Sequence, residues 1–290
     1  MSKTLNDTAL ENLVKVALAE DIGSGDATTL STVPEQLKTT AIILAKEDSV
    51  CAGLPICEKV FHELDKHSKF TAKVEEGEFC PAGTVLAEIF GNAQAILTGE
   101  RTALNYLQRI SGIATTAKKY VDETQGSKTQ ILDTRKTTPG LRMLEKYGVF
   151  MGGATNHRFG LFDRVMIKDN HRELAALSGN GGITRSVNAA RAKFPDLEVE
   201  VETDNLDEVK EAAEIGAEHI LLDNMSNDEV KEAIKIIAGR SQVEVSGGIT
   251  IERIASLAAI SGVDFISVGA LTHCIKSVDI SLDIQIDSNS

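Results

Sequence analysis

The stretch from residue 131 to 171 reads ILDTRKTTPGLRMLEKYGVFMGGATNHRFGLFDRVMIKDNH, and the interpretation of the whole chain starts from it. The window from Arg101 to Arg172, which contains this stretch, holds 13 Lys and Arg residues against 6 Asp and Glu residues, a local charge of +7. Because the whole chain carries −13, removing this +7 leaves −20 for all other residues. Clefts lined by one sign of charge concentrate ligands of the other sign. A basic island in an acidic chain therefore indicates an anion site.

A solvated, salt-bridged surface is the alternative explanation for such a run of charges. Against it, the basic residues lie beside Thr137-Thr138-Pro139-Gly140 and Met151-Gly152-Gly153, where irregular backbone is expected rather than a helix face. They also follow short apolar runs that are typical of strand ends, and two histidines and an asparagine lie among them. Solvation requires none of these features, so we predict a site for a small, multiply charged anion.

Length and composition describe an ordinary globular protein. The 290 residues are 42% apolar and 25% charged, and they suffice for a small domain plus a barrel-sized one. The acidic balance argues against nucleic-acid binding, which needs a broad basic face. The N-terminal segment lacks an apolar signal core and no run is long enough to cross a bilayer, so we expect no membrane association and a cytoplasmic location. The four cysteines form no CxxC pair and are expected to be reduced thiols.

The first 120 residues predict a small α/β domain. Helical patterns cover residues 7–20, with a capping box at Thr8 and Glu11, and later 53–66 and 93–123. Strand-like runs cover 39–51, 70–74 and 84–90, and residues 20–28 are expected to form a loop. The spacing of glycines at 77 and 83 also occurs in biotin- or lipoate-carrying domains, but such a domain needs two similar halves and only one is visible.

From residue 130 onward, strand-like runs alternate with helical segments. The runs end near Asp133, Lys168, Glu202, Asp223, Ser246 and Ser267, with helical patterns at 141–147, 184–193, 205–215, 227–238 and 250–259. Such alternation predicts a parallel sheet, either doubly wound or closed into a barrel. We favour a barrel, because there all the polar strand ends face one bowl, whereas an open sheet brings together only those near its switch point.

The strand ends also indicate chemistry. Gly-rich turns after the last two strands, Ser246-Gly247-Gly248 and Ser267-Val268-Gly269-Ala270, are typical of phosphate sites at helix N-termini. Glu202 and Asp223 end successive strands, and carboxylates in a phosphate site usually hold Mg²⁺. Glu198 and Glu200 are interpreted as ordinary positions of an alternating strand. Lys168 suits anion binding or a Schiff base.

Several motifs, in order along residues 7 to 275, resemble those of the quinolinate phosphoribosyltransferase family. They are Glu100-Arg101-Thr102-Ala103-Leu104-Asn105, Asp133-Thr134-Arg135-Lys136-Thr137-Thr138-Pro139-Gly140, Gly153-Ala154-Thr155-Asn156-His157-Arg158, Ile167-Lys168-Asp169-Asn170-His171, Leu222-Asp223-Asn224, Ser246-Gly247-Gly248-Ile249 and Ser267-Val268-Gly269-Ala270. The second and third of these are highly specific, and the matched positions show no departure from the family pattern.

The resemblance implies an N-terminal open α/β sandwich domain followed by an incomplete α/β barrel of about six strands. The expected domains are residues 1–115, 116–272 and a tail, 273–290, that packs back on the N-terminal domain. The implied reaction joins quinolinate and phosphoribosyl pyrophosphate (PRPP), with Mg²⁺, to give nicotinate mononucleotide, pyrophosphate and CO₂. It also implies a homodimer whose active sites are shared between subunits, with Arg101 acting on the partner's site.

By the same resemblance, residues are assigned roles in the reaction. The expected catalytic residues are Lys136, Lys168, Glu202 and Asp223, of which Glu202 and Asp223 also bind the metal. The expected substrate-binding residues are Arg101, Arg135, Lys136, His157, Arg158, Lys168, Asn170, His171, Glu202, Asp223, Ser246, Gly247, Gly248, Ser267, Gly269 and Ala270. Two alternatives remain open: an aldolase-type barrel using Lys168 as a Schiff base, and a non-catalytic protein that binds phosphometabolites.

Overall fold

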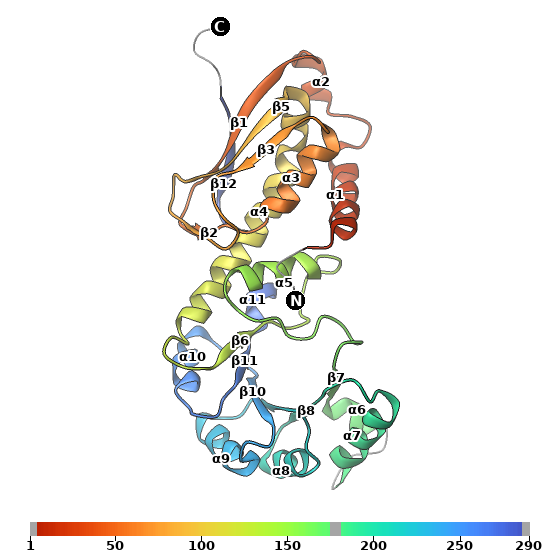
Figure 1. The fold of residues 1–290 in the computed structure, drawn as a ribbon, viewed down its shortest axis with the longest axis vertical. Helices are drawn as coiled ribbons and strands as arrows, with labels where there is room; N and C mark the ends of the chain where they lie inside the picture. The colour runs from red at the N-terminus through yellow and green to blue at the C-terminus, as the bar shows by residue number, and fades with distance from the viewer. Residues whose placement is uncertain (1–4, 175–180, 286–290) are drawn as a thin grey trace. The chain divides into compact units, whose positions relative to one another are not determined.

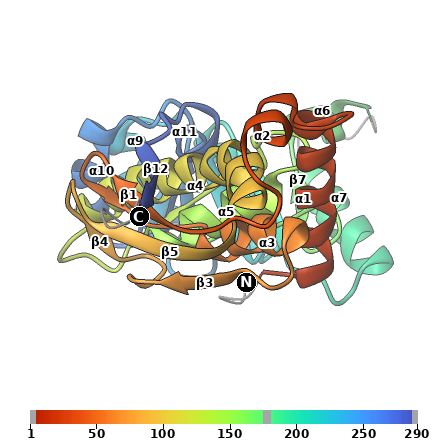
Figure 2. The same cartoon turned by 90° about the horizontal axis from the view of Figure 1, so that it is seen from above.

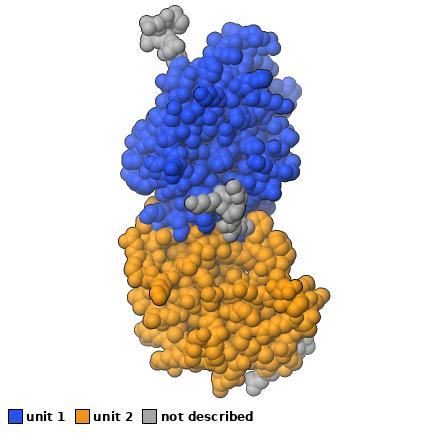
Figure 3. Space-filling view, in the orientation of Figure 1, with its two compact units in different colours: residues 1–118, 138–153, 271–290 blue, residues 119–137, 154–270 orange. Residues whose placement is uncertain are grey.

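The computed structural model describes residues 5–174 and 181–285. The chain divides into two compact units (Figure 3). Unit 1 comprises Met1–Lys118, Thr138–Gly153 and Leu271–Ser290, and unit 2 comprises Lys119–Thr137 and Ala154–Ala270. Residues 138–153, which fall inside the range expected for the barrel domain, thus belong to unit 1.

Unit 1 is built on a four-stranded antiparallel sheet. The strand order is β12 (Ile280–Gln285), β1 (Lys38–Ala45), β5 (Val85–Asn92) and β3 (Lys69–Ala72). Along β1, the alternate residues Ala41, Ile43 and Ala45 are fully buried, so one face of this sheet carries the core. A separate two-stranded ladder joins β2 (Ser49–Val50) to β4 (Phe79–Cys80).

The helices of unit 1 follow the predicted pattern with two differences. The first helix, α1 (Asp7–Ile22), packs beside α3 (Leu54–Leu64), as Figures 1 and 2 show, and α4 (Ala93–Asp122) follows β5 directly. The expected capping box is wrong, because Asn6 caps α1 and its side chain accepts from the Ala9 N–H at 2.9 Å. The end of the expected 20–28 loop instead begins a short helix, α2 (Ala27–Thr32), whose cap is the Asp26 carboxylate.

One later helix joins the core of unit 1. This helix, α5 (Arg142–Met151), buries Leu144 and Tyr147 in the same apolar cluster as α1, α3 and α4. The Tyr147 hydroxyl donates to Glu76 Oε2 at 2.6 Å, and Arg109 Nη2 donates to Glu145 Oε1 at 2.6 Å. Buried polar contacts of this kind fix α5 against residues more than thirty positions earlier in the chain.

Unit 2 is a curved parallel sheet of six strands, ordered β6-β11-β10-β9-β8-β7 (Figure 1). Their bounds are β6 Gln130–Leu132, β7 Val165–Ile167, β8 Val199–Thr203, β9 His219–Asp223, β10 Gln242–Ser246 and β11 Phe265–Ser267. Within residues 5–174 and 181–285, no hydrogen-bonded ladder joins the edge strands β6 and β7, so the barrel is incomplete. The predicted fold class is confirmed.

Helices cover the outside of this sheet (Figure 1). They are α6 (Asp169–Leu174), α7 (Gly182–Lys193), α8 (Leu206–Glu214), α9 (Asn227–Ile237) and α10 (Ile251–Ala258). The short α11 (Ala270–His273) follows β11, and its residues from Leu271 onward belong to unit 1. The central strands are buried on both faces, as in parallel sheets generally. All six strands run the same way, so their carboxyl ends lie at one edge of the sheet.

The Tyr147–Glu76 contact gives a prediction for the stability of unit 1. Tyr147→Phe is expected to lower the free energy of unfolding by about 1.5–3 kcal/mol, because the lost hydrogen bond goes to a buried carboxylate. The matched control is Tyr106→Phe, whose hydroxyl donates to the Leu13 carbonyl at 3.2 Å and whose loss should cost about 0.5–1.5 kcal/mol. Urea denaturation of both variants measures the difference, and an equal or smaller loss for Tyr147→Phe contradicts it.

Candidate active site

A cavity of about 450 Å³ opens at the carboxyl ends of the strands of unit 2. Lys168 follows β7, Glu202 lies near the end of β8, and Asp223, Ser246 and Ser267 end β9, β10 and β11. Parallel strands ending at one edge bring these residues together. The lining residues are Thr134, Arg135, Lys136, His157, Arg158, Met166, Lys168, Glu202, Leu221, Asp223, Glu244, Ser246 and Ser267.

Two arginines meet in this cavity. Burial, and then the charge of Arg135, lower the pKa of Arg158. The guanidinium of Arg158 is held by a hydrogen bond from Nη1 to the Arg164 carbonyl at 3.1 Å. Two guanidinium groups that repel each other in a half-buried site are stabilised by an anion between them, and a carboxylate matches their planar donors.

The buried carboxylate of Asp133 organises the turn that carries the second arginine. Its Oδ1 accepts from the His157 backbone N–H at 2.8 Å, and its Oδ2 accepts from Asn156 Nδ2 at 2.8 Å. The Thr155 N–H also donates to the Ile131 carbonyl at 2.8 Å, which lays this segment along β6. The returning chain is therefore fixed where Arg158 reaches the cavity.

Carboxylates also line the cavity. The Lys168 ammonium bonds Glu202 Oε2. Burial, and next the charge of Asp204, raise the pKa of Asp223, while Lys168 and Lys136 act against this rise. Asp223 Oδ2 also accepts from Asn224 Nδ2 at 2.6 Å. Acidic groups crowded in this way are stabilised by a bound cation, and carboxylate oxygens are ligands that Mg²⁺ prefers.

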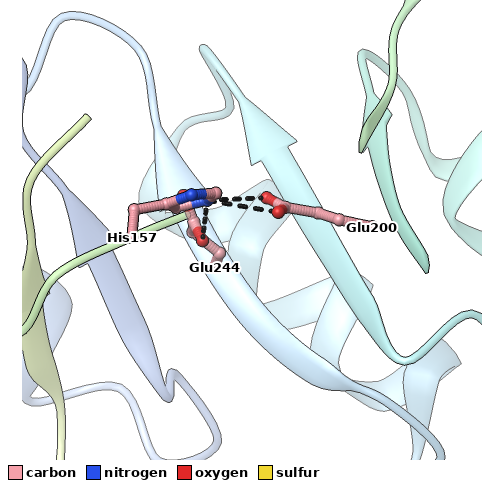
Figure 4. A group of neighbouring side chains, drawn as sticks. All are labelled: His157, Glu200 and Glu244. Atoms are coloured by element: carbon pink, nitrogen blue, oxygen red, sulfur yellow. Dashed lines mark hydrogen bonds and ion pairs between the residues drawn. The ribbon is translucent and has the colours of Figure 1, made fainter. Parts of the chain in front are cut away.

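A third group of charges adjoins the cavity, where His157 and Glu244, which line it, meet the buried Glu200 (Figure 4). His157 Nε2 lies 3.1 Å from Glu200 Oε2 and 3.4 Å from Glu244 Oε2. Burial opposes a charge on the ring, but the two carboxylates outweigh it and raise the pKa of His157 to about 9. Burial and the neighbouring Glu200 raise the pKa of Glu244.

The spacing of these three side chains would suit a metal ion, but the contacts of the ring do not. The Arg158 backbone N–H donates to Nδ1 at 2.7 Å, which makes Nδ1 an acceptor and places the ring proton on Nε2. A protonated Nε2 cannot bind a metal. The two carboxylates favour a second proton on the ring, but on Nδ1 it would meet the Arg158 N–H at 2.7 Å, so in this arrangement the ring carries one proton. The cluster is therefore a hydrogen-bonded group.

Other predicted site residues lie outside the cavity lining. Gly247 and Gly248 form the turn after β10 with φ of 86° and 58°, and a Cβ on Gly247 would lie 2.2 Å from Asn224 Oδ1. Gly269 lies between β11 and α11, and Ala270 begins α11. Asn170 and His171 are exposed on α6, where His171 Nδ1 accepts from the Lys168 N–H at 3.0 Å. Arg101 lies exposed on α4, in unit 1.

Three buried acidic residues of this region were not among the predicted site residues: Asp133, Glu200 and Glu244. The interpretation of Glu200 as an ordinary position of an alternating strand is wrong, because its side chain is fully buried against His157 and Arg164. For Asp133, the signal was its place directly after the apolar run of β6. Glu244 has the same even spacing to Ser246 that Glu200 has to Glu202, and this shared strand face was the available signal.

The family model "Quinolinate phosphoribosyl transferase, C-terminal domain" matches residues 113–283, and its N-terminal counterpart matches residues 26–111. The chain belongs to the quinolinate phosphoribosyltransferase family. It is 41% identical to the probable nicotinate-nucleotide pyrophosphorylase (carboxylating) of Bacillus subtilis, covering 99% of this chain and 97% of that one.

Other members of the quinolinate phosphoribosyltransferase family agree over nearly the same length. The chloroplastic nicotinate-nucleotide pyrophosphorylase (carboxylating) of Arabidopsis thaliana is 42% identical, with coverage of 95% of this chain and 83% of that protein. The crystal structure of NadC from Streptococcus pyogenes superposes with a TM-score of 0.93 at 38% identity, covering 99% and 100% of the two chains. Neither the aldolase nor the non-catalytic alternative is favoured by these relatives. Across the described residues, no helix is long and apolar enough to cross a membrane.

The two hydrogen bonds accepted by Asp133 give a prediction for the stability of unit 2. Asp133→Asn is expected to destabilise unit 2 by about 1–3 kcal/mol, because both carboxylate oxygens accept hydrogen bonds and an amide nitrogen accepts none. The control is Asp264→Asn, since Asp264 accepts from the Val243 N–H with one oxygen, at 2.8 Å, which the amide oxygen can replace. Denaturation curves test the order of the two losses; equal losses argue against the role given to Asp133.

Proposed function

We propose that this protein transfers the phosphoribosyl group of PRPP to quinolinate with decarboxylation, giving nicotinate mononucleotide, pyrophosphate and CO₂ in NAD synthesis. One observation carries the proposal: a single cavity joins the Arg135 and Arg158 side to the Glu202 and Asp223 side. The first side suits a dicarboxylate, and the second suits the ribose and a metal-bound pyrophosphate. Membership in the family supports the same pairing of substrates.

In this proposal the pyridine nitrogen of quinolinate displaces pyrophosphate at C1 of the ribose through an oxocarbenium-like transition state. Arg135, Arg158 and Lys168 hold the two carboxylates and orient the nitrogen. Lys136 stabilises the charge that develops on the departing pyrophosphate. The transfer leaves a positively charged pyridinium ring. That ring stabilises the carbanion formed when the adjacent carboxylate leaves as CO₂, and a proton taken up from solvent at the same carbon gives nicotinate mononucleotide.

The donor set of the cavity fits Mg²⁺. Glu202 and Asp223 supply carboxylate oxygens at neighbouring strand ends, and phosphate oxygens of PRPP would complete the coordination. When bound, the ion neutralises pyrophosphate charge. The 5′-phosphate would then lie at the turns after β10 and β11, where Ser246 and Ser267 line the cavity and Gly247 and Gly248 have positive φ.

Further parts of the proposal concern the assembly and the location of the enzyme. We take it to work as a cytoplasmic homodimer in which Arg101 completes the partner's cavity. Arg101 belongs to the basic window from Arg101 to Arg172, yet its side chain is exposed in unit 1. A cavity that is open at the strand ends also needs a cover to keep water from an oxocarbenium-like transition state.

The decisive experiment mixes the protein with quinolinate, PRPP and Mg²⁺ and follows release of CO₂ and formation of the mononucleotide. Turnover that stops in excess EDTA supports both the reaction and the metal. Turnover that continues in EDTA removes the metal from the proposal. Binding of both ligands without turnover would favour the non-catalytic alternative, and borohydride trapping of Lys168 with a keto substrate would favour the aldolase.

The paired arginines predict which substrate a mutation affects. Arg158→Ala is expected to weaken quinolinate binding by about 1.5–3 kcal/mol, the value of a charge-assisted hydrogen bond in a desolvated site, and to leave PRPP binding nearly unchanged. Arg191→Ala is the control, because Arg191 pairs with Glu218 outside the cavity. Calorimetric titration of each ligand separately measures both effects. Similar losses for quinolinate and PRPP contradict the assignment.

The shared active site predicts complementation between two inactive variants. Arg101→Ala and Lys168→Ala are each expected to abolish most activity, the first by changing the partner's cavity and the second by changing its own. In a mixed dimer one cavity holds neither mutation and the other holds both. Random subunit exchange of equal amounts gives four kinds of cavity in equal numbers, and one of these kinds is intact. Activity should therefore return to about a quarter of wild type. Exchange shown to occur without recovery of activity would place Arg101 in its own subunit's site or in none.

A further inference from the structure

Two carboxylates lie at the His157 ring, one of them lining the cavity, where cations alone would be expected beside an anion. Glu200 and Glu244 are 0% and 1% exposed, and they approach the His157 ring from β8 and β10, two strands separated by β9 (Figure 4). Negative charge beneath a site for a dianion weakens binding, and burying it costs free energy. Such an arrangement calls for a function that the anion contacts alone do not supply.

Glu200 alone would satisfy the ring. Its two oxygens lie 3.3 and 3.1 Å from His157 Nε2, and Arg164 Nη1 lies 3.4 Å from the second of them. A histidine with one Nε2 proton needs one acceptor, and Glu200 already provides it. Glu244 is therefore in excess for hydrogen bonding.

Glu244 is also poorly satisfied itself. Among the described residues, neither of its buried oxygens makes a hydrogen bond of good geometry. The charged groups beside it are His157, whose Nε2 lies 3.4 Å away, and Glu200. The Ser267 hydroxyl also faces it. A buried polar group in this state costs about 1–3 kcal/mol of stability. Proteins often retain such costly groups where function depends on them.

The contacts of the ring indicate what that function is. With Nε2–H directed to the carboxylates, Nδ1 faces the Arg158 backbone N–H at 2.7 Å. The orientation of the ring thus sets the position of the Arg158 backbone, and the Arg158 side chain lines the cavity. One carboxylate fixes Nε2 along one direction, whereas two carboxylates from different strands also restrict rotation of the ring.

We propose that Glu244 is a positioning residue of the dicarboxylate site, acting through His157 to hold Arg158 where it meets the substrate carboxylate. This inference rests on the proposed function, since it assigns the residue to the quinolinate side of the cavity. It predicts that Glu244 contributes to quinolinate binding while it lowers the stability of the fold. Burial and the neighbouring Glu200 raise the pKa of Glu244, as expected where two carboxylates are held at one ring.

Three substitutions of Glu244 test this role. Glu244→Met keeps the volume but removes both oxygens, so the dissociation constant of quinolinate should rise about tenfold, on the order expected for small misplacements in a site. Glu244→Gln keeps an oxygen near Nε2 and should restore binding to within about threefold of wild type. Glu244→Asp shortens the side chain and moves the carboxylate away from the ring, so this variant should bind quinolinate as weakly as the Met variant. If Glu244→Met does not fold, the Asp variant provides the test. PRPP binding should stay within about twofold in all three.

The melting temperature separates positioning from a structural role. We expect the melting temperature of Glu244→Met to equal or exceed that of wild type, because an unsatisfied buried carboxylate is removed. The matched control is Glu198→Met, which removes a similar contact, Glu198 Oε2 to His219 Nε2 at 3.0 Å, outside the cavity. It should change neither ligand's binding.

Two outcomes overturn the inference: quinolinate binding unchanged in the Met and Asp variants, or equal losses for quinolinate and PRPP together with a lowered melting temperature. Wild-type protein that fails to turn over quinolinate and PRPP refutes the proposed function instead. Wild-type turnover with unaffected variants refutes only the role of Glu244.

Discussion

The two hydrogen bonds accepted by Asp133 are the constraint on which the site depends. Between Thr137 and Ala154 the chain leaves unit 2, forms α5 in the core of unit 1, and returns. The returning segment has no strand of its own to guide it and is fixed by the Asp133 carboxylate and by a single bridge between Leu132 and Thr155. Because Arg135 lies before the excursion and Arg158 after it, this closure decides whether the two arginines share a cavity.

The cavity places like charges together on both of its sides. Arg135 lowers the pKa of Arg158 on one side, and Asp204 helps to raise the pKa of Asp223 on the other. Without ligands, such groups destabilise the fold; a dianion and a cation would relieve the two sides separately. A site built in this way binds two oppositely charged partners more readily than either alone, because each one neutralises the field that disfavours the other.

Much of the fold and part of the site could be predicted from the sequence, because apolar runs and the polar residues after them are local signals. The alternation that predicted six parallel strands is such a signal, and Lys168, Asp223 and Ser246 were found by their places at strand ends. The place of α5 in unit 1 and the pairing of β12 with β1 depend on contacts between residues far apart in the sequence. No periodicity within either segment specifies such a partner, which is why neither could be derived from pattern alone.

The acidic residues around β8 show a second limit of prediction from sequence, which concerns how deeply a side chain is buried rather than which segment it contacts. Glu198, Glu200 and Glu202 share one strand parity, so period-2 reasoning treats them alike. In the barrel they lie at three levels. Glu198 is 60% exposed at the start of the strand beside His219, Glu200 is buried against His157, and Glu202 bonds Lys168 at the cavity. Each carboxylate meets a basic side chain at its own level. Parity identifies the face of a strand on which a side chain lies. The way the sheet curves around that face decides which glutamate is solvated, which is buried against His157, and which lines the cavity.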